Sequence, residues 1–337
     1  MEPRRIIAIG CSAGGVQTLS RLVSDLPPDI PAAICVVVHF PPDSTSVLPR
    51  ILERAGKLPA SHAHDGDLLE AGRIYVAPPD WHLVVNGMDL ALSHAPAENG
   101  HRPAIDVLLR SVARTWNGRG IGVILSGTGD DGTAGLGVLR ARGGVAIVQD
   151  PVEAIFAAMP RSALENVDVT YCVPVADMGP LLAGLAAALV EPVAAPQVGA
   201  EGAEDPAEES AGPTPIGGAS GLTCPDCGGA LWEIEEGSVL RFRCRVGHTF
   251  SPESLFDQQW DELEHALWAA VRALDERAAL SRRIAARFRA RGHREMAERF
   301  EARAQSAVDR AAVIQRALVS GSEANPAPAS GDFGDSE

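Results

Sequence analysis

The sequence predicts an α/β protein with a doubly wound, mostly parallel β-sheet and helices on both faces of that sheet. Short apolar runs at residues 6–9 and 33–38 show no polar alternation, which is typical of strands buried on both faces. Longer amphipathic segments, such as 105–116, separate these runs, so strands and helices alternate along the chain. The hydrophobic content of 46% is sufficient for a large core in a chain of 337 residues.

Further elements follow from the same criteria. The dipeptide Asn86-Gly87 separates two short apolar runs, 83–85 and 90–93, and this arrangement predicts a β-hairpin. A helix is expected over residues 154–166. The remaining predicted strands of the main domain are 73–78, 122–125, 145–148 and 170–173.

Composition limits the possible functions. The chain has 29 Lys and Arg residues against 44 Asp and Glu residues, a formal charge of −15, which disfavours nucleic acid as a partner. The longest apolar stretch, 181–190, is too short to span a membrane, so we expect no membrane insertion. Six cysteines in a chain of this length do not indicate a disulfide framework. We therefore expect a cytoplasmic protein.

A glycine-rich turn follows the first predicted strand and contains Ser12. Residues 10–14 read Gly-Cys-Ser-Ala-Gly, the G-x-S-x-G pattern that exposes a nucleophilic serine where a strand turns into a helix. Such a turn also serves as a phosphate cradle or has a purely structural role in other α/β proteins. The dinucleotide pattern G-x-G-x-x-G is absent, because Ser12 occupies the position of its second glycine.

Two other predicted strands end in residues that suit acid–base chemistry. His39 follows the strand at 33–38, and Asp130 and Asp131 follow the strand at 122–125. The carboxyl ends of parallel strands meet at one edge, so these residues and Ser12 are expected to form a site for acyl transfer. The residues alone do not choose between the two aspartates, and either also suits a helix N-cap. His39 also suits a partly buried structural histidine.

Six collinear motifs between residues 4 and 190 resemble the catalytic domain of the chemotaxis receptor methylesterases, the CheB family. The motifs are GCSAGG, VHFPP, RIYVAPPDWH, HRPAIDVLLRSVA, GVILSGTGDDGTAGL and VQDPVEAIFAAMPRSAL. The resemblance implies hydrolysis of glutamyl methyl esters on a methylated chemoreceptor-type protein and, as a further activity, deamidation of its glutamines. It also implies a Ser-His-Asp triad of Ser12, His39 and Asp131, with no cofactor for catalysis.

The resemblance also implies cleft residues and a regulatory domain. Ala13, Thr128 and Met159 match positions at the oxyanion site and the cleft, although the family often has Thr in place of Ala13 and Met in place of Thr128. Family members commonly carry a receiver domain before the catalytic domain. The catalytic motifs here begin near residue 4, so we expect that domain to be absent and regulation to come from other parts of the chain.

We expect the catalytic domain to span residues 1–192, followed by a flexible acidic linker at 193–222. A zinc-ribbon-like module is predicted over 223–251. It contains Cys-x2-Cys and Cys-x3-His pairs, which supply four ligands for a closed structural zinc site. The alternative is a degenerate ribbon that folds without metal. The predicted ligands are Cys224, Cys227, Cys244 and His248.

Apolar residues at spacings of three and four predict a helical hairpin over residues 252–319, with a turn at Gly292. Such a hairpin could mediate homo-oligomerisation or receptor docking, or could form an ordinary two-helix unit. The tail at 320–337 is expected to be disordered.

The main hypothesis is therefore a protein-glutamate methylesterase. An alternative from another class is a catalytically weak or inactive signalling adaptor that recruits partners through its ribbon and helices. A nucleotide-binding protein is a third alternative, which the missing G-x-G-x-x-G disfavours.

Overall fold

A computed structural model describes residues 1–188, 217–236 and 239–324. Most of the predicted linker and all of the predicted tail after residue 324 lie outside these residues. The chain forms two compact units, Met1–Leu255 and Phe256–Glu337. No helix in the described part of the chain is long and apolar enough to span a membrane.

The first unit contains a seven-stranded sheet in which every neighbouring pair is parallel, as predicted. The strand order is β3-β4-β2-β1-β7-β8-β9, so β1 lies at the centre between β2 and β7. The main strands are buried along their whole length, which explains their continuous apolar runs. The strands are β1 (Arg5–Cys11), β2 (Ala32–Val38), β3 (Ala60–His62), β4 (Ile74–Val76), β7 (Gly120–Ile124), β8 (Val145–Gln149) and β9 (Tyr171–Val173).

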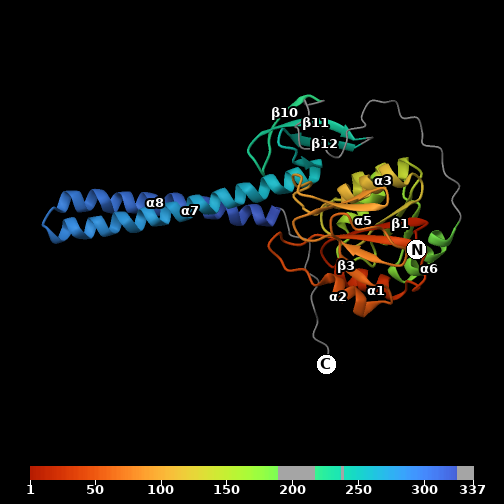
Figure 1. Ribbon diagram of the computed structural model, residues 1–337. Helices are drawn as coiled ribbons and strands as arrows, with labels where there is room; N and C mark the ends of the chain where they lie inside the picture. The colour runs from red at the N-terminus through yellow and green to blue at the C-terminus, as the bar shows by residue number, and fades with distance from the viewer. Residues whose placement is uncertain (189–216, 237–238, 325–337) are drawn as a thin grey trace. The chain divides into compact units, whose positions relative to one another are not determined.

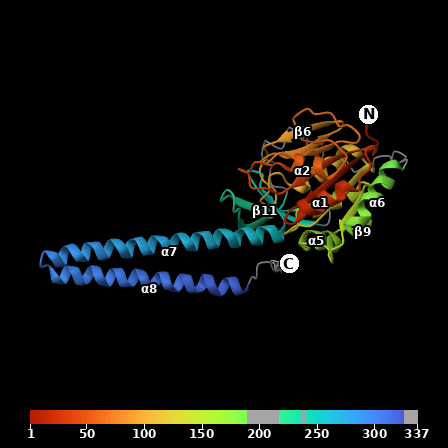
Figure 2. The same cartoon turned by 90° about the horizontal axis from the view of Figure 1, so that it is seen from below.

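Helices cover both faces of this sheet (Figures 1 and 2). Helices α1, α2 and α6 pack with one apolar cluster, and α3, α4 and α5 pack with the cluster on the other face. The predicted hairpin is also present and consists of the antiparallel strands β5 (His82–Asn86) and β6 (Asp89–Ser93). The helices are α1 (Gly15–Ser24), α2 (Leu48–Ala55), α3 (Ile105–Trp116), α4 (Thr133–Ala141), α5 (Ala158–Asn166) and α6 (Val175–Ala187).

The register of the central strands determines which residues share the carboxyl edge of the sheet. Cys11 pairs with Val38 at the ends of β1 and β2, and the His39 N–H donates a hydrogen bond to the Cys11 carbonyl at 3.3 Å. Ser12 and His39 therefore follow adjacent positions on neighbouring strands, which lie about 4.8 Å apart.

The first unit also contains a small antiparallel sheet of order β10-β11-β12-β13, hereafter the ribbon. Its first strand lies largely within the segment predicted as linker, because Ala219–Thr223 pairs with the next strand along the chain. Its core is small and includes Leu231, Phe242 and Phe250 together with two cysteines. The strands are β10 (Ala219–Thr223), β11 (Ala230–Glu236), β12 (Val239–Cys244) and β13 (Thr249–Phe250).

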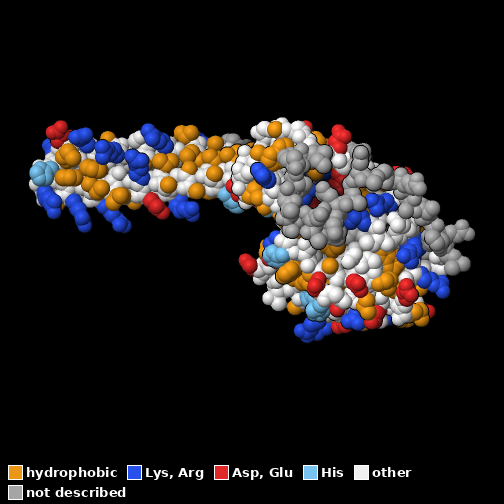
Figure 3. Space-filling model, turned by 45° about the horizontal axis from the view of Figure 1, so that its top comes forward, with side chains coloured by type: hydrophobic (Ala, Val, Ile, Leu, Met, Phe, Trp, Pro, Cys, Tyr) orange, Lys and Arg blue, Asp and Glu red, His pale blue; other side chains and the backbone are white. Residues whose placement is uncertain are grey.

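Two long helices, α7 (Pro252–Ala290) and α8 (Arg294–Ala324), form the predicted hairpin, and α8 continues beyond the predicted end at residue 319. Gly292 allows the turn between them, because its φ of 79° lies in the left-handed region. Small residues such as Ala285 and Ala304 are buried along these helices, which favours close packing. Figure 3 shows further hydrophobic side chains on their visible surface, and Trp260 and Trp268 are among the exposed ones.

The turn before α4 provides a test of backbone and packing constraints. Gly129 and Gly132 both have positive φ, 73° and 95°. A Cβ on Gly129 would meet nothing within 4 Å, whereas one on Gly132 would lie 2.6 Å from Ile124 Cδ1. Gly129→Ala should lower the free energy of unfolding by about 1 kcal/mol through backbone strain alone. Gly132→Ala should cost a further ~1–3 kcal/mol through overpacking.

Urea denaturation of both variants checks this expectation. Equal losses of stability in the two variants would contradict the packing argument.

Candidate active site

Ser12 lies in a tight turn between β1 and α1. Gly14 has φ 70°, and a Cβ on it would lie 2.8 Å from Ile155 Cβ, so only glycine fits this turn without strain. The Ser12 N–H donates to the Ser126 carbonyl at 3.0 Å, which ties the turn to the end of β7. The elbow that the G-x-S-x-G pattern predicts is thus present as a strand–turn–helix unit.

Ser126 holds this turn together, a role that no local sequence pattern predicted. Its Oγ donates to the Ala13 carbonyl at 2.9 Å and accepts the Phe156 N–H at 2.9 Å, while its own N–H donates to Gln149 Oε1 at 2.8 Å. Ser126 is completely buried. It therefore cross-links three loops at the carboxyl edge rather than offering a free hydroxyl.

His39 and Asp131 form a direct pair. His39 Nε2 lies 2.8 Å from Asp131 Oδ2, and both side chains are buried. Because an ionised carboxylate only accepts hydrogen bonds, we assign the proton to Nε2, which leaves Nδ1 as the basic nitrogen. His39 Nδ1 is buried and has no hydrogen-bond partner in the described part of the chain, so its lone pair is available.

Asp131 is a buried carboxylate with many donors around it. Burial alone would raise its pKa, but the hydrogen bond from His39, the positive charges that His39 and His101 carry when protonated at low pH, and the Ile105 N–H hold the pKa well below its usual range. The Ile105 and Asp106 N–H groups at the start of α3 donate to its two oxygens at 2.7 and 3.2 Å. The Asn99 side-chain amide donates at 3.1 Å. Asp131 is therefore ionised and fixed in place.

Asp130 occupies different surroundings. It lines a second cavity of about 260 Å³ together with Ser251 and Glu253 from the ribbon end of the unit. The pKa of Asp130 is raised to about 6, mainly by burial and also by the charges of Asp106, Glu253 and Asp131, while hydrogen bonding to Ser251 opposes the rise. The geometry thus separates the two aspartates that residue patterns alone left equivalent, since it is Asp131 that accepts the hydrogen bond of His39.

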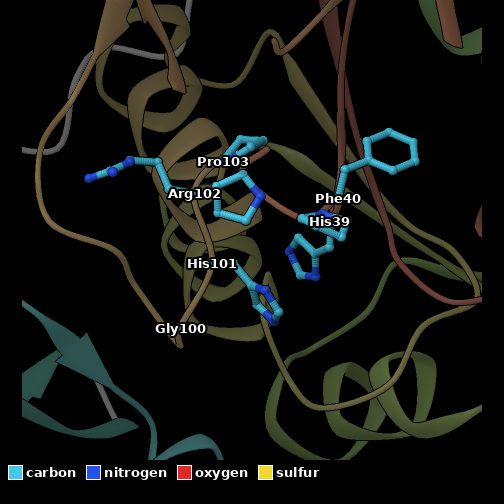
Figure 4. A pocket seen from close by; sticks show the side chains of 8 residues that line it. His39, Phe40, Gly100, His101, Arg102 and Pro103 are labelled. Carbon is cyan, nitrogen blue, oxygen red and sulfur yellow. The ribbon is translucent and has the colours of Figure 1, made fainter. Parts of the chain in front are cut away.

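A cavity of about 350 Å³ opens beside His39 (Figure 4). The ring of His101 stacks on the ring of His39 with centroids 3.6 Å apart and planes 16° apart. The pKa of His101 is lowered to about 4, mainly by burial and also by the charge of a protonated His39, while the charge of Asp131 opposes this, so His101 is neutral at pH 7. His101 thus forms a neutral wall of the cavity against the imidazole. The other lining residues are Phe40, Pro41, Pro42, Gly100, Arg102 and Pro103.

The three residues expected at the oxyanion site and cleft have different settings. The backbone N–H groups of Ala13 and Thr128 meet no acceptor among the residues described, so both are available as donors. The Met159 N–H donates to the Gly127 carbonyl at 3.1 Å, and its side chain is fully buried. A Cβ on Gly127 would collide with Met159 Sδ and lie 3.0 Å from Ser12 Cβ. Met159 Sδ and Ser12 Cβ therefore lie on the same side of Gly127, where a Cβ would point, and only glycine fits between them.

The four predicted metal ligands come together in the ribbon. Cys224, Cys227, Cys244 and His248 place their ligand atoms within 4.8 Å of one another. Cys244 Sγ and Cys224 Sγ lie 3.5 and 3.7 Å from His248 Nδ1, and the Sγ atoms of Cys227 and Cys244 are 3.6 Å apart. Tetrahedral zinc with bonds of about 2.3 Å to sulfur and 2.0–2.1 Å to nitrogen requires edges of roughly 3.5–3.8 Å. This Cys3His group is thus placed to hold a metal.

The carboxyl edge as a whole brings together the residue types that acyl transfer requires, a serine, a histidine and a buried carboxylate, on an α/β sheet. A serine in a tight elbow lies next to a histidine with a free ring nitrogen, and a buried carboxylate orients that histidine. The Ser12 hydroxyl makes no hydrogen bond with the residues described. In unliganded sites the hydrogen bond between a nucleophile and its base is often long.

Comparison with known proteins gives the same class. The family model described as CheB methylesterase matches residues 7–182. The chain therefore belongs to the CheB methylesterase family, which acts in chemotaxis, as the sequence motifs predicted.

Curated relatives and a solved structure agree with this assignment. A protein-glutamate methylesterase/protein-glutamine glutaminase of Symbiobacterium thermophilum is 40% identical over 48% of this chain and 45% of its own length. The Pyrococcus horikoshii protein of the same name is 36% identical over 51% of this chain and 48% of its own. The chain thus spans about half the length of these relatives. The crystal structure of the Thermotoga maritima CheB methylesterase catalytic domain is 33% identical with a TM-score of 0.52, covering 54% of this chain and 98% of that one.

The raised pKa of Asp130 makes a prediction about stability. A carboxyl with a folded-state pKa of about 6 and an ordinary value of 3.8 stabilises the fold fully below pH 3.8, and this contribution is lost as pH rises through about 6. Asp130→Asn removes the ionisation, so it should raise the free energy of unfolding by about 1–2 kcal/mol at pH 7.5 and much less at pH 4.

Urea denaturation at the two pH values measures the difference. Asp29→Asn is a matched control, because Asp29 is exposed. A gain from Asp130→Asn that does not change with pH would contradict the expectation.

Proposed function

We propose that this protein is a protein-glutamate methylesterase that hydrolyses glutamyl methyl esters on a chemoreceptor-type protein. The observation that supports this most strongly is the His39–Asp131 pair at 2.8 Å, at the strand end beside Ser12. The family assignment supplies the substrate class, since the curated relatives carry the name of this activity.

The proposed reaction has two stages. Ser12 Oγ attacks the ester carbonyl carbon and gives its proton to His39 Nδ1, and the protonated imidazole is stabilised by Asp131. The carbonyl oxygen gains negative charge, which the free N–H groups of Ala13 and Thr128 are suited to receive. The proton on His39 then passes to the methoxy oxygen as the bond between this oxygen and the carbonyl carbon breaks. Methanol departs, and the acyl group remains on Ser12.

The second stage regenerates the enzyme. Water enters as methanol departs, gives a proton to His39 Nδ1 and attacks the acyl carbon. The proton returns to Ser12 Oγ as the bond to the acyl group breaks, and a free glutamate side chain is released. The same acyl-enzyme forms from glutamine with ammonia as the leaving group, so we include deamidation as a second reaction of this site.

We propose zinc as the metal of the Cys3His group, with a structural role. Four protein ligands complete a tetrahedral shell and leave no open position for a substrate. The site would contribute to folding of the ribbon, whose apolar core is small.

Unpaired thiols at Cys11 and Cys35 fit a reducing compartment, so we also propose that the protein acts in the cytoplasm.

Replacement of the nucleophile tests the proposed function. Ser12→Ala should lower methanol release from methylated receptor fragments by about three or more orders of magnitude without unfolding the protein. Asp131→Asn should cost about three to four orders of magnitude, since it disturbs the tautomer and the charge that support His39. Asp130→Asn is the matched control and should retain most of the activity. Near-normal turnover by the Ser12→Ala variant would exclude the mechanism.

Metal analysis tests the ribbon site. Freshly purified protein should contain about one equivalent of zinc, and Cys227→Ser should lose most of it. Cys172→Ser provides the control, because Cys172 is an exposed free cysteine outside the cluster. A wild-type protein without zinc, or a Cys227→Ser variant with full zinc content, would refute this assignment.

A further inference from the structure

The buried side chain of Asn99 connects Asp131 to the ribbon. Its Nδ2 donates to Asp131 Oδ1 and to Asp106 Oδ2, both at 3.1 Å. Its Oδ1 accepts the Ser251 N–H at 3.0 Å and the Ser254 hydroxyl at 3.1 Å. One amide therefore holds the carboxylate that orients His39 and is itself held by residues that follow the ribbon.

The ribbon also contributes a buried cation to this region. Arg241, on β12, is 1% exposed; its Nη1 donates to Asp106 Oδ2 at 2.7 Å and its Nη2 to Glu98 Oε2 at 3.2 Å. Within the described residues, Arg241 is the only cation in an ion pair with Asp106. Asp106 in turn accepts the Gly135 N–H at the start of α4, at 2.7 Å.

Removal of Arg241 would break the ion pair of Asp106 and leave only the weaker charge effect of Arg110 to compensate its burial. Burial raises the pKa of Asp106, Arg241 lowers it, and the nearby charge of Asp131 raises it again. Without the guanidinium, Asp106 would either be a costly unpaired charge or take up a proton. A proton on Asp106 Oδ2 would oppose the hydrogen bond that this oxygen now accepts from Asn99 Nδ2. Either result would disturb the amide that holds Asp131.

The ribbon fixes the loop around His101 as well. The Asn99 N–H donates to the Thr249 carbonyl on β13 at 2.7 Å, and Glu98 forms a β-bridge with Thr249. This loop continues directly to His101, whose ring stacks on His39. The metal ligands Cys244 and His248 lie next to the strand ends that make these contacts. Both partners of the His39–Asp131 pair are therefore supported by ribbon contacts.

We infer that the ribbon completes the active site, with Arg241 as a positioning residue that acts on Asp131 through Asp106 and Asn99. This inference rests on the proposed hydrolase function of Ser12, His39 and Asp131. It assigns the ribbon a catalytic consequence in addition to any stability that a bound metal provides.

Steady-state kinetics of Arg241→Met test the inference. Two substrates are used, methylated receptor fragments with methanol as the readout and p-nitrophenyl acetate as a simple ester. Turnover on both should fall roughly 10–100-fold with little change in KM, because the ground-state cavity is unchanged while the pair beside Ser12 is misplaced. Arg241→Lys should lose less turnover than Arg241→Met, because it keeps the positive charge. Its single ammonium cannot contact both Asp106 and Glu98 as the guanidinium does, so the recovery should be partial. Arg245→Met, an exposed change in the same ribbon, should match wild type.

A second variant tests the connection between Arg241 and Asp131 at Asn99, in the loop before His101. Asn99→Gly removes the amide at a residue whose φ is 51°, a conformation that glycine adopts freely. It should lower turnover to a similar extent, and the double variant should lose less than the product of the two single effects. If Arg241→Met does not fold, Asn99→Gly and Arg241→Lys decide the question. Metal content and thermal unfolding of every variant separate loss of the ribbon from loss of positioning.

The outcomes separate the two proposals. Wild-type turnover in Arg241→Met, or a rise in KM alone, would overturn the positioning role. Wild-type protein that cleaves p-nitrophenyl acetate but releases no methanol would overturn the receptor substrate and leave the positioning test intact on the simple ester. Wild-type protein inactive on both esters would overturn both proposals.

Discussion

The structure depends on keeping Asp131 ionised in a buried position. Burial of a carboxylate is unfavourable unless donors and charges compensate, and here the start of α3, the Asn99 amide and His39 supply them. The same contacts fix the direction of the His39 ring and leave its Nδ1 free. The parallel register places His39 at the end of β2, on the strand next to the one that leads into Ser12. The contacts that keep Asp131 ionised therefore also orient His39.

The ribbon extends this arrangement beyond the CheB-family sheet. The family match ends at residue 182, yet Arg241, Ser251 and Ser254 contact groups that surround the Asp131 carboxylate. A buried network of this kind is costly if any member lacks its partner, so the ribbon and the sheet behave as one compact unit. Metal binding at Cys244 and His248 would then support the strands that carry these contacts.

Local patterns predicted much of this fold. Apolar runs gave the central strands, and Asn86-Gly87 gave the hairpin, because these depend on neighbouring residues. The roles of Asn99, Ser126 and Arg241 were not predicted, since each depends on a contact with a residue distant in sequence. Most of strand β10 was assigned to the linker because that segment is rich in small and polar residues and lacks apolar periodicity, and only its pairing with β11 defines it as a strand. The Asp130–Asp131 ambiguity was likewise resolved by side-chain direction, which residue order does not encode.

Covalent labelling tests the central claim, that the His39–Asp131 pair activates Ser12, most directly. A serine-directed fluorophosphonate reacts with a serine hydroxyl made nucleophilic by an adjacent base. Mass spectrometry of the digested protein should find one adduct, on the peptide that contains Ser12, and His39→Ala should abolish it. Absence of an adduct in wild-type protein, an adduct on another serine such as Ser126, or full labelling of the His39→Ala variant would contradict the account.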